Sequence, residues 1–575
     1  MNPLDCVIIP YSRSGSYLKI FRAPTGRLMI AGVKTHSVSK VGARQWSHDY
    51  TQIGVFRGKK ELIYDWECEP GQVKLSFDGG SGKLAFLDSD TVGVSIKGAH
   101  LKLLPTKSVS SIQRPTKNSA VLHDYYGLCK QMYRAGRATT LAVEQTRTVY
   151  GETGPYDDVP YAMTFRSKGA AEGFVRISRF GEKWDDRLPA VSKAASEAHR
   201  DWMDFHQKAP KVADRYSGAA AFAWYLLWQL HVEADGNISY PCVFTSRRWL
   251  NKVWAWDSCF NAIAIAEVDL DMGLNMLRLF IEKQEPAGSF PDHLTNLDVQ
   301  YTFSTAPIFG WAISQLIRRH SKKRLSAFLK KIYSALSRNT DWWFEYRDDN
   351  GNGFPSYLNA QESGWDKSSL FEERLPVEGA DLTTYLILQM DTLAEIARYI
   401  GKRSEATAWK KRGQKLLDKL LGERVRSNRF YSPINGKKSN SKIDTIFNYM
   451  PLLLGNRVPE KIRKKAVAGL SEGGNLLREN GLLVQYYDHN LPKEEGLRFG
   501  PISPSLTYLI FNALLESNEN GLAWTIADRF CQSCAEDARM WQYYHAHTGE
   551  GIRCPSYSST ASIFILLAQW LGQNE

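Results

Sequence analysis

The hydrophobic period changes once along the chain, near residue 195, and this change limits the possible folds more than any other feature. Before it, residues alternate as in β-strands, and "TVGVSIKGAHLKLL" places Val92, Val94 and Ile96 on one side. The stretch "VKLSFDGGSGKLAFLD" sets two alternating runs around a glycine-rich turn, which predicts a hairpin. Because turn signals recur roughly every ten residues, we predict a β-sandwich over residues 1–195.

After the change, apolar residues recur with helical spacing. The stretch "DLTTYLILQMDTLAEIARYIG" predicts a helix that ends at Gly401, and a second helix follows it. Similar pairs are expected at residues 210–235, 257–285, 305–345, 459–480, 503–530 and 557–571. Roughly a dozen helices without a fixed-length repeat favour a helical toroid, although an open array would give the same count. The predicted fold is therefore multidomain, with an all-α domain over residues 196–575 after the sandwich.

Composition narrows the function only in part. The 17 Trp, 27 Tyr and 25 Phe suit sugar binding, because sugar faces stack on aromatic rings, but a large aromatic core explains them equally well. The formal net charge is +12, yet the basic residues are spread over helical stretches such as "RRHSKKRLSAFLKKIY". That spread indicates solvated helix faces and argues against nucleic-acid binding.

The cysteines and the N-terminus bear on cofactors and location. "CQSC" has no second pair at zinc-finger spacing, so we predict no metal site, and scattered thiols fit a reducing compartment. "MNPLDCVIIPYSRSG" lacks the basic start and apolar run of a signal peptide. No apolar stretch reaches the roughly eighteen residues that span a bilayer. We therefore predict a cytoplasmic protein without a membrane partner; a trimmed leader and the oligomeric state are left open.

Three segments between the predicted helices carry chemistry. In "SRRWLNKVWAWDSCFNAIA" (246–264), Asp257 is expected beside a helix that starts near Ser258, where the dipole keeps it ionised or where it only caps the helix. In "NGNGFPSYLNAQESGWDKSSLFEERL" (350–375), Trp365 adjoins Asp366. An aromatic wall raises a carboxyl pKa, as a general acid requires, although a turn with a capping Asp fits equally. In "MWQYYHAHTGEG" (540–551), aromatic rings surround Gln542.

Together these segments resemble the inverting glycosidases of the trehalase and glycoside hydrolase family 63 group. "VWAWDSCF", "AQESGWDKSS" and "MWQYYHAHTGEG" are similar to that group's W-x-W-D-S-x-F, E-S-G-x-D-x-S and W-E-N-Y-x-x-x-T-G-E-G segments. The likeness extends over residues 200–575, with "PAGSFPDHLTN" and "STAPIFGWA" as weaker matches. It implies an (α/α)6 barrel behind a β-sandwich, with Asp366 as general acid and Trp256 and Asp257 on the sugar of the cleaved subsite. It also implies that position 542 holds the general base.

The resemblance suggests an exo-acting, inverting α-glycosidase, similar to an α-glucosidase, that hydrolyses a small α-linked glucoside or related saccharide. This chemistry needs no metal or organic cofactor. Beyond the residues already named, we expect substrate contacts from Arg248, Phe260, Gln361, Glu362, Trp365, Tyr544 and His545. The segment "LRFGPISPSLTYL" (497–509) lacks two tryptophans of the family's W-R-G-P-x-W-P, so the substrate is expected to differ from those of better-known members.

Gln542 is the serious departure from the family pattern. Inversion needs an acid and a base on opposite faces of the sugar, and a neutral amide cannot take a proton from water. A general base contributes roughly 10²–10⁴-fold, so we predict impaired hydrolysis. Three explanations are left open: an engineered Glu-to-Gln change, another base such as Glu550, or a non-hydrolytic sugar binder. A sugar isomerase or epimerase is a further alternative, but only His545 and His547 cluster near a motif.

Overall fold

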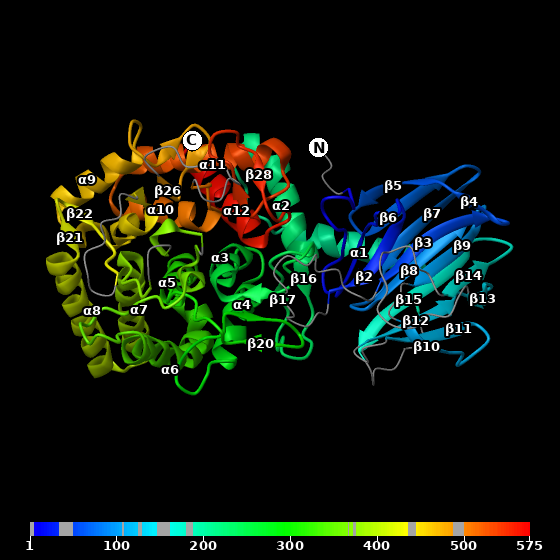
Figure 1. Cartoon of the computed structure of the whole chain (residues 1–575), viewed down its shortest axis with the longest axis horizontal. Helices are drawn as coiled ribbons and strands as arrows, with labels where there is room; N and C mark the ends of the chain where they lie inside the picture. The colour runs from blue at the N-terminus through cyan, green and yellow to red at the C-terminus, as the bar shows by residue number, and fades with distance from the viewer. Residues whose placement is uncertain are drawn as a thin grey trace.

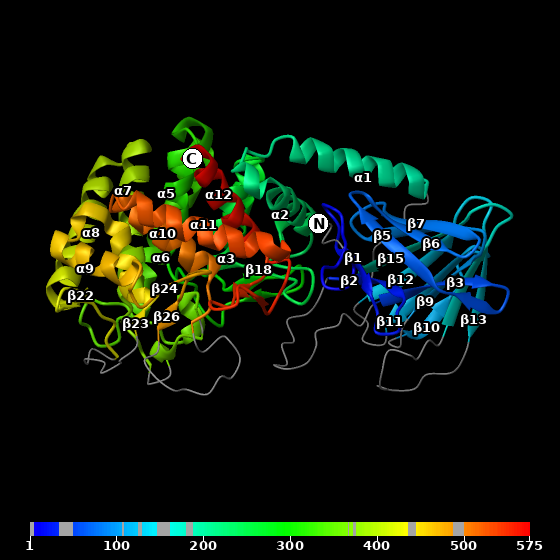
Figure 2. The same ribbon diagram turned by 90° about the horizontal axis from the view of Figure 1, so that it is seen from above.

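The computed structural model describes residues 5–33, 50–105, 109–124, 129–145, 161–179, 188–365, 367–371, 375–434, 444–486 and 500–575. A β-rich lobe and a helical lobe lie side by side (Figure 1), which confirms the predicted fold class. Helix α1 (Val191–His206) lies along the β-rich lobe, against β6, β7 and β8, and leads into the helical lobe (Figure 2). The predicted division at residue 195 falls within α1 and stays a prediction. Within the described residues, no helix combines the length and apolar character needed to cross a bilayer.

Two antiparallel sheets form the β-rich lobe. One has the order β1-β2-β3-β9-β14-β13, with β4 beside β3, and the other has the order β10-β11-β12-β15-β8-β7-β6-β5. The strands are β1 (Leu18–Arg22), β2 (Leu28–Gly32), β3 (Tyr50–Arg57), β4 (Lys60–Leu62), β5 (Tyr64–Glu69), β6 (Gln72–Phe77), β7 (Gly80–Phe86), β8 (Thr91–Lys97), β9 (His100–Pro105), β10 (Val109–Gln113), β11 (Ser119–Asp124), β12 (Cys129–Ala135), β13 (Thr140–Gln145), β14 (Tyr161–Arg166) and β15 (Ala171–Arg179).

The local patterns explain these strands. The predicted hairpin is confirmed as β6 and β7, with Gly79 at φ 65° in the turn, a conformation that glycine adopts at little cost. Val92, Val94 and Ile96 of β8 are all fully buried, so their side of the strand faces the core between the sheets. Alternation therefore predicted the core face of this sheet correctly.

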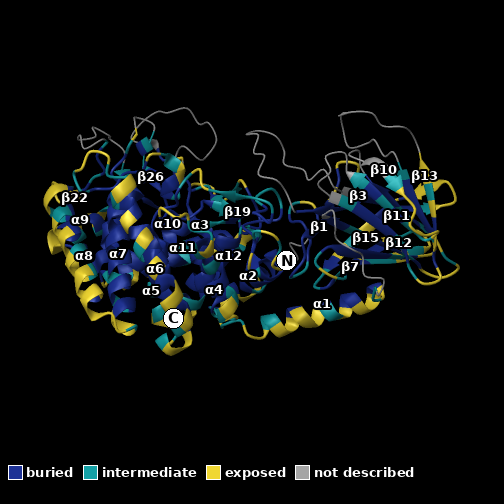
Figure 3. Ribbon diagram, turned by 90° about the horizontal axis from the view of Figure 1, so that it is seen from below, coloured by how far each residue is buried: buried dark blue, intermediate teal, exposed yellow. Residues whose placement is uncertain are grey.

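The helical lobe is a closed ring of helix pairs. Around its inside, α3, α5, α7, the 3₁₀ segment η4, α10 and α12 contact one another in this order, and α12 returns to α3. Their partners α2, α4, α6, α8, α9 and α11 pack outside them. Every residue of α3 is buried, as expected for an inner helix, whereas α8 carries exposed residues along its outer side (Figure 3). The toroid, rather than the open array, is therefore confirmed.

The helical elements have the following bounds: α2 (Ser217–Leu230), α3 (Ala255–Ile265), α4 (Leu270–Glu282), α5 (Phe309–Arg319), α6 (Lys322–Tyr346), α7 (Ala380–Tyr399), α8 (Arg403–Glu423), η4 (Ile446–Arg457), α9 (Glu460–Leu470), α10 (Pro504–Glu516), α11 (Asn520–Asp537) and α12 (Ser558–Gln573). The predicted pair at 459–480 is wrong, because α9 is followed by short strands β24 (Leu477–Arg478) and β25 (Gly481–Leu482). Gly473, at φ 79°, lies between α9 and β24. The predicted pairs at 210–235 and 557–571 are also wrong, because each range holds one α-helix. These helices are α2, preceded by a 3₁₀ turn at Asp214–Tyr216, and α12.

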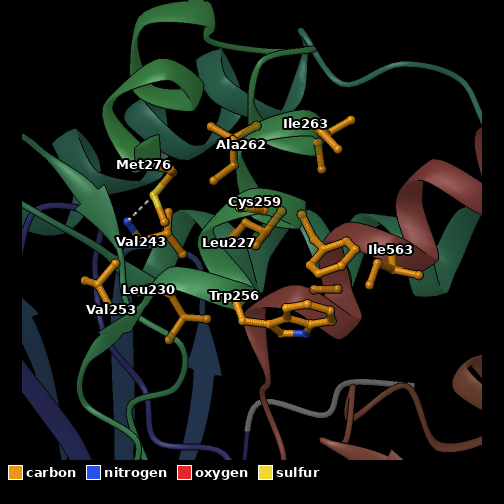
Figure 4. Packing of buried hydrophobic residues seen from close by; sticks show 14 of the residues in the cluster. Leu227, Leu230, Val243, Val253, Trp256, Cys259, Ala262, Ile263, Met276 and Ile563 are labelled. Atoms are coloured by element: carbon orange, nitrogen blue, oxygen red, sulfur yellow. Dashed lines mark hydrogen bonds between the residues drawn. The ribbon is translucent and has the colours of Figure 1, made fainter. Parts of the chain in front are cut away.

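The core anchors the start of α3. Leu227 of α2, Cys259 of α3 and Ile563 of α12 belong to one packed cluster (Figure 4). In the same cluster the backbone N–H of Val243 donates to Sδ of Met276 at 3.3 Å. Such close packing holds the first turn of α3 in one position relative to its neighbours.

Candidate active site

The three motif segments lead to the N-terminal ends of inner helices. The first precedes α3, the second lies ahead of α7, and the third precedes α12. Two hydrogen bonds link the start of α3 to other inner helices. The indole N–H of Trp256 donates to Oγ of Ser505, at the start of α10, at 3.1 Å, and Oγ of Ser559, at the start of α12, donates to Oδ1 of Asp257 at 2.6 Å. The starts of α3, α10 and α12 therefore meet at one end of the ring.

Asp257 lies in the first turn of α3, not beside its start. The helix begins at Ala255, three residues earlier than predicted, because the Ala255 N–H donates to the Asp292 carbonyl at 2.9 Å. Burial raises the pKa of Asp257 to about 6, and hydrogen bonds from Ser559 and Tyr557 only partly oppose this rise. Its place in the first turn is one where the helix dipole favours the charged form, and burial acts against that effect. Asp257 is nevertheless mostly ionised at pH 7.

Trp256 joins the first two motif segments. A Cβ atom on Gly364 would lie 2.6–2.7 Å from atoms of the Trp256 indole, so the Gly364 backbone rests directly on this ring. Gly364 also has φ 78°, which favours glycine. Phe260 is fully buried behind Trp256, with ring centroids 5.5 Å apart, and supports the indole from the core.

The second segment is held by its own carboxylate. Glu362, 1% exposed, forms an ion pair with Arg347 at 3.0 Å and accepts the Leu358 N–H at 2.8 Å. It also completes a capping box with Asn359 at the start of η2 (Ala360–Ser363). Gln361 is exposed on the same turn. Asp366 lies outside the described residues.

The third segment begins a short hairpin of β27 (Tyr543–Tyr544) and β28 (Gly551–Ile552). Gln542 is half-buried, its backbone N–H donates to the Cys554 carbonyl at 2.7 Å, and its Nε2 donates to the Tyr543 hydroxyl at 3.4 Å. The ring of Tyr543 meets that of Trp365 edge to face, with centroids 5.1 Å apart. The segments that carry Asp366 and Gln542 are therefore in contact through the residues next to them.

The remaining residues of this hairpin have structural contacts. Tyr544 is fully buried and its hydroxyl accepts the Trp541 N–H at 3.2 Å. Nδ1 of His545 accepts the Thr548 N–H at 3.2 Å within the hairpin turn. Glu550 is exposed, and the register of the hairpin places it opposite His545. His545 is three residues after Gln542, so Glu550 lies roughly 10 Å from Gln542 along the strand direction. That separation places Glu550 away from the position expected for the base.

The β-rich lobe holds the start of the first segment. Nζ of Lys19, in β1, donates to the carbonyl groups of Arg247 and Arg248 at 2.8 and 3.0 Å. Arg248 in turn donates from Nη1 to the Ile8 carbonyl at 2.8 Å, so its contact is with the β-rich lobe. Sγ of Cys554 donates to Oγ of Ser246 at 3.3 Å. The backbone carbonyl of Cys554 accepts the N–H of Gln542. A chain of hydrogen bonds thus runs from β1 to Gln542.

Sequence reasoning missed several residues of this region. Tyr543 was overlooked beside Gln542, although its aromatic ring in the motif was a usable signal. Ser505 and Ser559 had no signal, because their partners lie far away in the sequence. Asp381 lies in the first turn of α7, is fully buried, and accepts a hydrogen bond from the Tyr357 hydroxyl at 2.7 Å. Burial raises its pKa to about 7. Among the described residues, no cluster of three His, Cys, Asp or Glu side chains is arranged to hold a metal ion.

The fold and the motif segments define a glycosidase built on an (α/α)6 ring. A family model described as the mannosylglycerate hydrolase MGH1-like glycoside hydrolase domain matches residues 251–560, more than half of the chain. The chain belongs to this family of glycoside hydrolases, and the resemblance to glycoside hydrolase family 63 is confirmed.

Solved structures agree on the fold. A GH63 mannosylglycerate hydrolase from Thermus thermophilus in complex with glucose has a TM-score of 0.50 and 17% identity, over 60% of this chain and 98% of that chain. The same enzyme with Tris and D-glycerate has a TM-score of 0.52 and 16% identity, over 61% and 99%. A bacterial glucoamylase complexed with acarbose has a TM-score of 0.60 and 10% identity, over 100% and 95%, and so matches both lobes. The predicted role of each site residue stays a prediction.

Proposed function

We propose that this chain is an exo-acting, inverting α-glycosidase, similar to an α-glucosidase, that hydrolyses a small α-linked glucoside or a related saccharide. The observation that carries the proposal is the contact of Trp365 with Tyr543, at 5.1 Å between ring centroids. It supports a site with Asp366 on one side and position 542 on the other. The similar structures hold glucose, D-glycerate or acarbose, which supports a small saccharide as substrate.

The residues would divide the work as follows. Asp366 protonates the glycosidic oxygen as the bond breaks, and Asp257 accepts hydrogen bonds from hydroxyls of the sugar that Trp256 contacts. Gln361 and His545, which are exposed or half-buried, are proposed to touch the substrate. Arg248, Phe260, Glu362, Trp365 and Tyr544 are proposed to act through the residues that they hold in place.

Position 542 determines the rate. The Gln542 amide can hydrogen-bond a water molecule but cannot remove its proton, so the attacking water stays neutral. We therefore propose that the chain binds its substrate but hydrolyses it slowly. A carboxylate at this position would accelerate hydrolysis by about 10²–10⁴-fold.

The test compares the wild type with Gln542→Glu on a panel of α-linked glucose, mannose and galactose disaccharides and glucosylglycerate, with the released anomer followed by proton NMR. We expect activity mainly in Gln542→Glu, with the β-anomer appearing first, because inversion of an α-linkage gives that product. Adding Asp366→Asn to Gln542→Glu should abolish the gain.

Other outcomes separate the alternatives. Equal activity in both proteins, lost in Glu550→Gln, would make Glu550 the base. Glucose binding by both proteins without hydrolysis would identify a carbohydrate-binding protein instead. An aldose or ketose formed from a free sugar in the same spectra would identify an isomerase or epimerase.

A further inference from the structure

Lys252 is a buried cation next to the candidate site. Its residue is 7% exposed, and its Nζ lies 2.9 Å from Nε2 of His293. Among the described residues, Nζ of Lys252 makes no other hydrogen bond, and no carboxylate of those residues forms an ion pair with Lys252. An ammonium group has three N–H donors, so two of them have no acceptor among the described residues, although little of Lys252 is exposed to water.

Asp292 and His293 fix the position of this ammonium group. Nδ1 of His293 lies 2.8 Å from Oδ2 of Asp292. Because an ammonium group only donates, Nε2 of His293 is the acceptor and Nδ1 carries the hydrogen that is donated to Asp292. Asp292 therefore holds the imidazole in the orientation that presents Nε2 to Lys252.

An aromatic ring completes the arrangement. Trp254 of β18 (Val253–Trp254) pairs directly with His293 of β19 (His293–Leu294), and their rings lie 5.1 Å apart. Nζ of Lys252 lies 5.5 Å from the centroid of the Trp254 ring. Trp254 and His293 are half-buried, whereas Val253 and Leu294 on the other face are buried. We call Lys252, Trp254 and His293 the Lys252 platform.

The platform adjoins the candidate sugar site. Strand β18 runs directly into α3, which carries Trp256 and Asp257, and the Ala255 N–H bonds the Asp292 carbonyl. The negative charge of Asp292 is among the causes that raise the pKa of Asp257, so the two carboxylates interact electrostatically. Asp292 bonds His293 through its side chain and the start of α3 through its carbonyl, and so joins the platform to the helical turn that carries Asp257.

We propose that Lys252 binds an oxygen of the group attached to the sugar at Asp257, and so selects the leaving group. This inference rests on the proposed glycosidase function. The oxygen belongs to a sugar hydroxyl or to a carboxylate, since both accept from an ammonium group. Trp254 offers a flat apolar face for the carbon skeleton of the same group. Asp292 and His293 act as positioning residues, because they orient Lys252 without touching the ligand.

The test measures binding by calorimetry in the wild type, in Lys252→Met, and in Lys461→Met as the matched control. Lys461 is exposed on α9 and lies in the same lobe. The probes are glucose, maltose and D-glycerate. We expect Lys252→Met to bind glucose as the wild type does and to bind maltose or D-glycerate about 10- to 100-fold more weakly, the loss expected for one charge-assisted hydrogen bond.

Each outcome has a distinct meaning. A loss confined to maltose assigns a hydroxyl acceptor, and a loss confined to D-glycerate assigns a carboxylate. Unchanged affinity for both, with glucose still bound, overturns the inference and leaves the proposed function standing. A wild type that binds none of the three probes refutes the proposed function and the inference together.

A second variant serves if Lys252→Met does not fold. Lys252→Gln removes the charge but keeps a neutral N–H donor, with Lys461→Gln as its matched control. In the same calorimetry, we expect Lys252→Gln to bind glucose unchanged and to bind the better-binding probe of maltose and D-glycerate more weakly, while Lys461→Gln changes neither affinity. Unchanged affinity of Lys252→Gln for that probe would refute the role of the Lys252 charge in binding.

Discussion

Replacing Gly364 by alanine tests the arrangement in which the E-S-G turn rests on Trp256. The new Cβ would lie 2.6–2.7 Å from three atoms of the Trp256 indole, well inside van der Waals contact. The indole cannot turn away freely, because its N–H donates to Ser505 and its ring packs on Phe260. Either the turn lifts off the ring or the ring loses these contacts.

The expected magnitude has two parts. A non-glycine residue at φ 78° costs about 1–2 kcal/mol, and an overpacked core costs about 1–3 kcal/mol more. The unfolding free energy should therefore fall by about 2–5 kcal/mol. Glucose binding should weaken too, because the same displacement moves Trp256.

The assay is urea unfolding followed by tryptophan fluorescence, with glucose titrated into the folded protein. The control is Gly422→Ala, since a Cβ on Gly422 near the end of α8 meets nothing within 4 Å. The control should stabilise the protein by about 0.5 kcal/mol, because alanine favours a helix over glycine. A Gly364→Ala protein as stable as the wild type, with unchanged glucose affinity, would refute the proposed seating of the turn.

Three further predictions concern buried charges. Burial lowers the pKa of Lys19 from 10.5 to about 7, so between these pH values the unfolded chain binds one more proton than the folded chain. The unfolding free energy of the wild type should therefore rise with pH over this range relative to that of Lys19→Met. Parallel curves of unfolding free energy against pH for the two proteins would contradict this. Burial raises the pKa of Asp381 from 3.8 to about 7, so the folded protein loses stability as pH rises through this range and the buried carboxyl ionises. In urea unfolding, the unfolding free energy of Asp381→Asn should therefore increase relative to that of the wild type from pH 5 to pH 8. Asp257→Ala should weaken glucose binding about 10- to 100-fold. The affinity of the wild type for glucose should also fall below pH 6, because Asp257 is then protonated. Calorimetry at pH 5 and pH 7.5 tests both expectations.

The elements that follow from local pattern were predictable. Leu382, Leu386, Met390 and Leu393 share one helical face in the sequence, and all four are fully buried in α7. Such a face must find a partner surface wherever the helix packs, so periodicity alone reveals it. The β6–β7 hairpin follows for the same reason, because its turn and its alternation are both local.

What depends on distant contacts was not predictable. The hydrogen bond from Ser559 to Asp257 joins residues 302 positions apart, and it exists only because the ring closes. The earlier start of α3 and the raised pKa of Asp257 likewise depend on Asp292 and on burial, which no single motif encodes. The hydrogen bond from Arg248 to Ile8 was equally hidden, because nothing in the sequence pairs these two residues; the substrate contact expected from Arg248 stays a prediction.

The bonds between β1 and the first motif segment bear on how this architecture can be recombined. Arg247 is fully buried and donates to the carbonyl groups of Gln229, His231 and Leu18, and the last of these belongs to the β-rich lobe. Exchanging that lobe for one from a relative would leave the backbone partners of Lys19 and Arg247 unmatched. Residues 8–19 and 245–256 are therefore best treated as one inheritable block, and chimeras should be joined outside it.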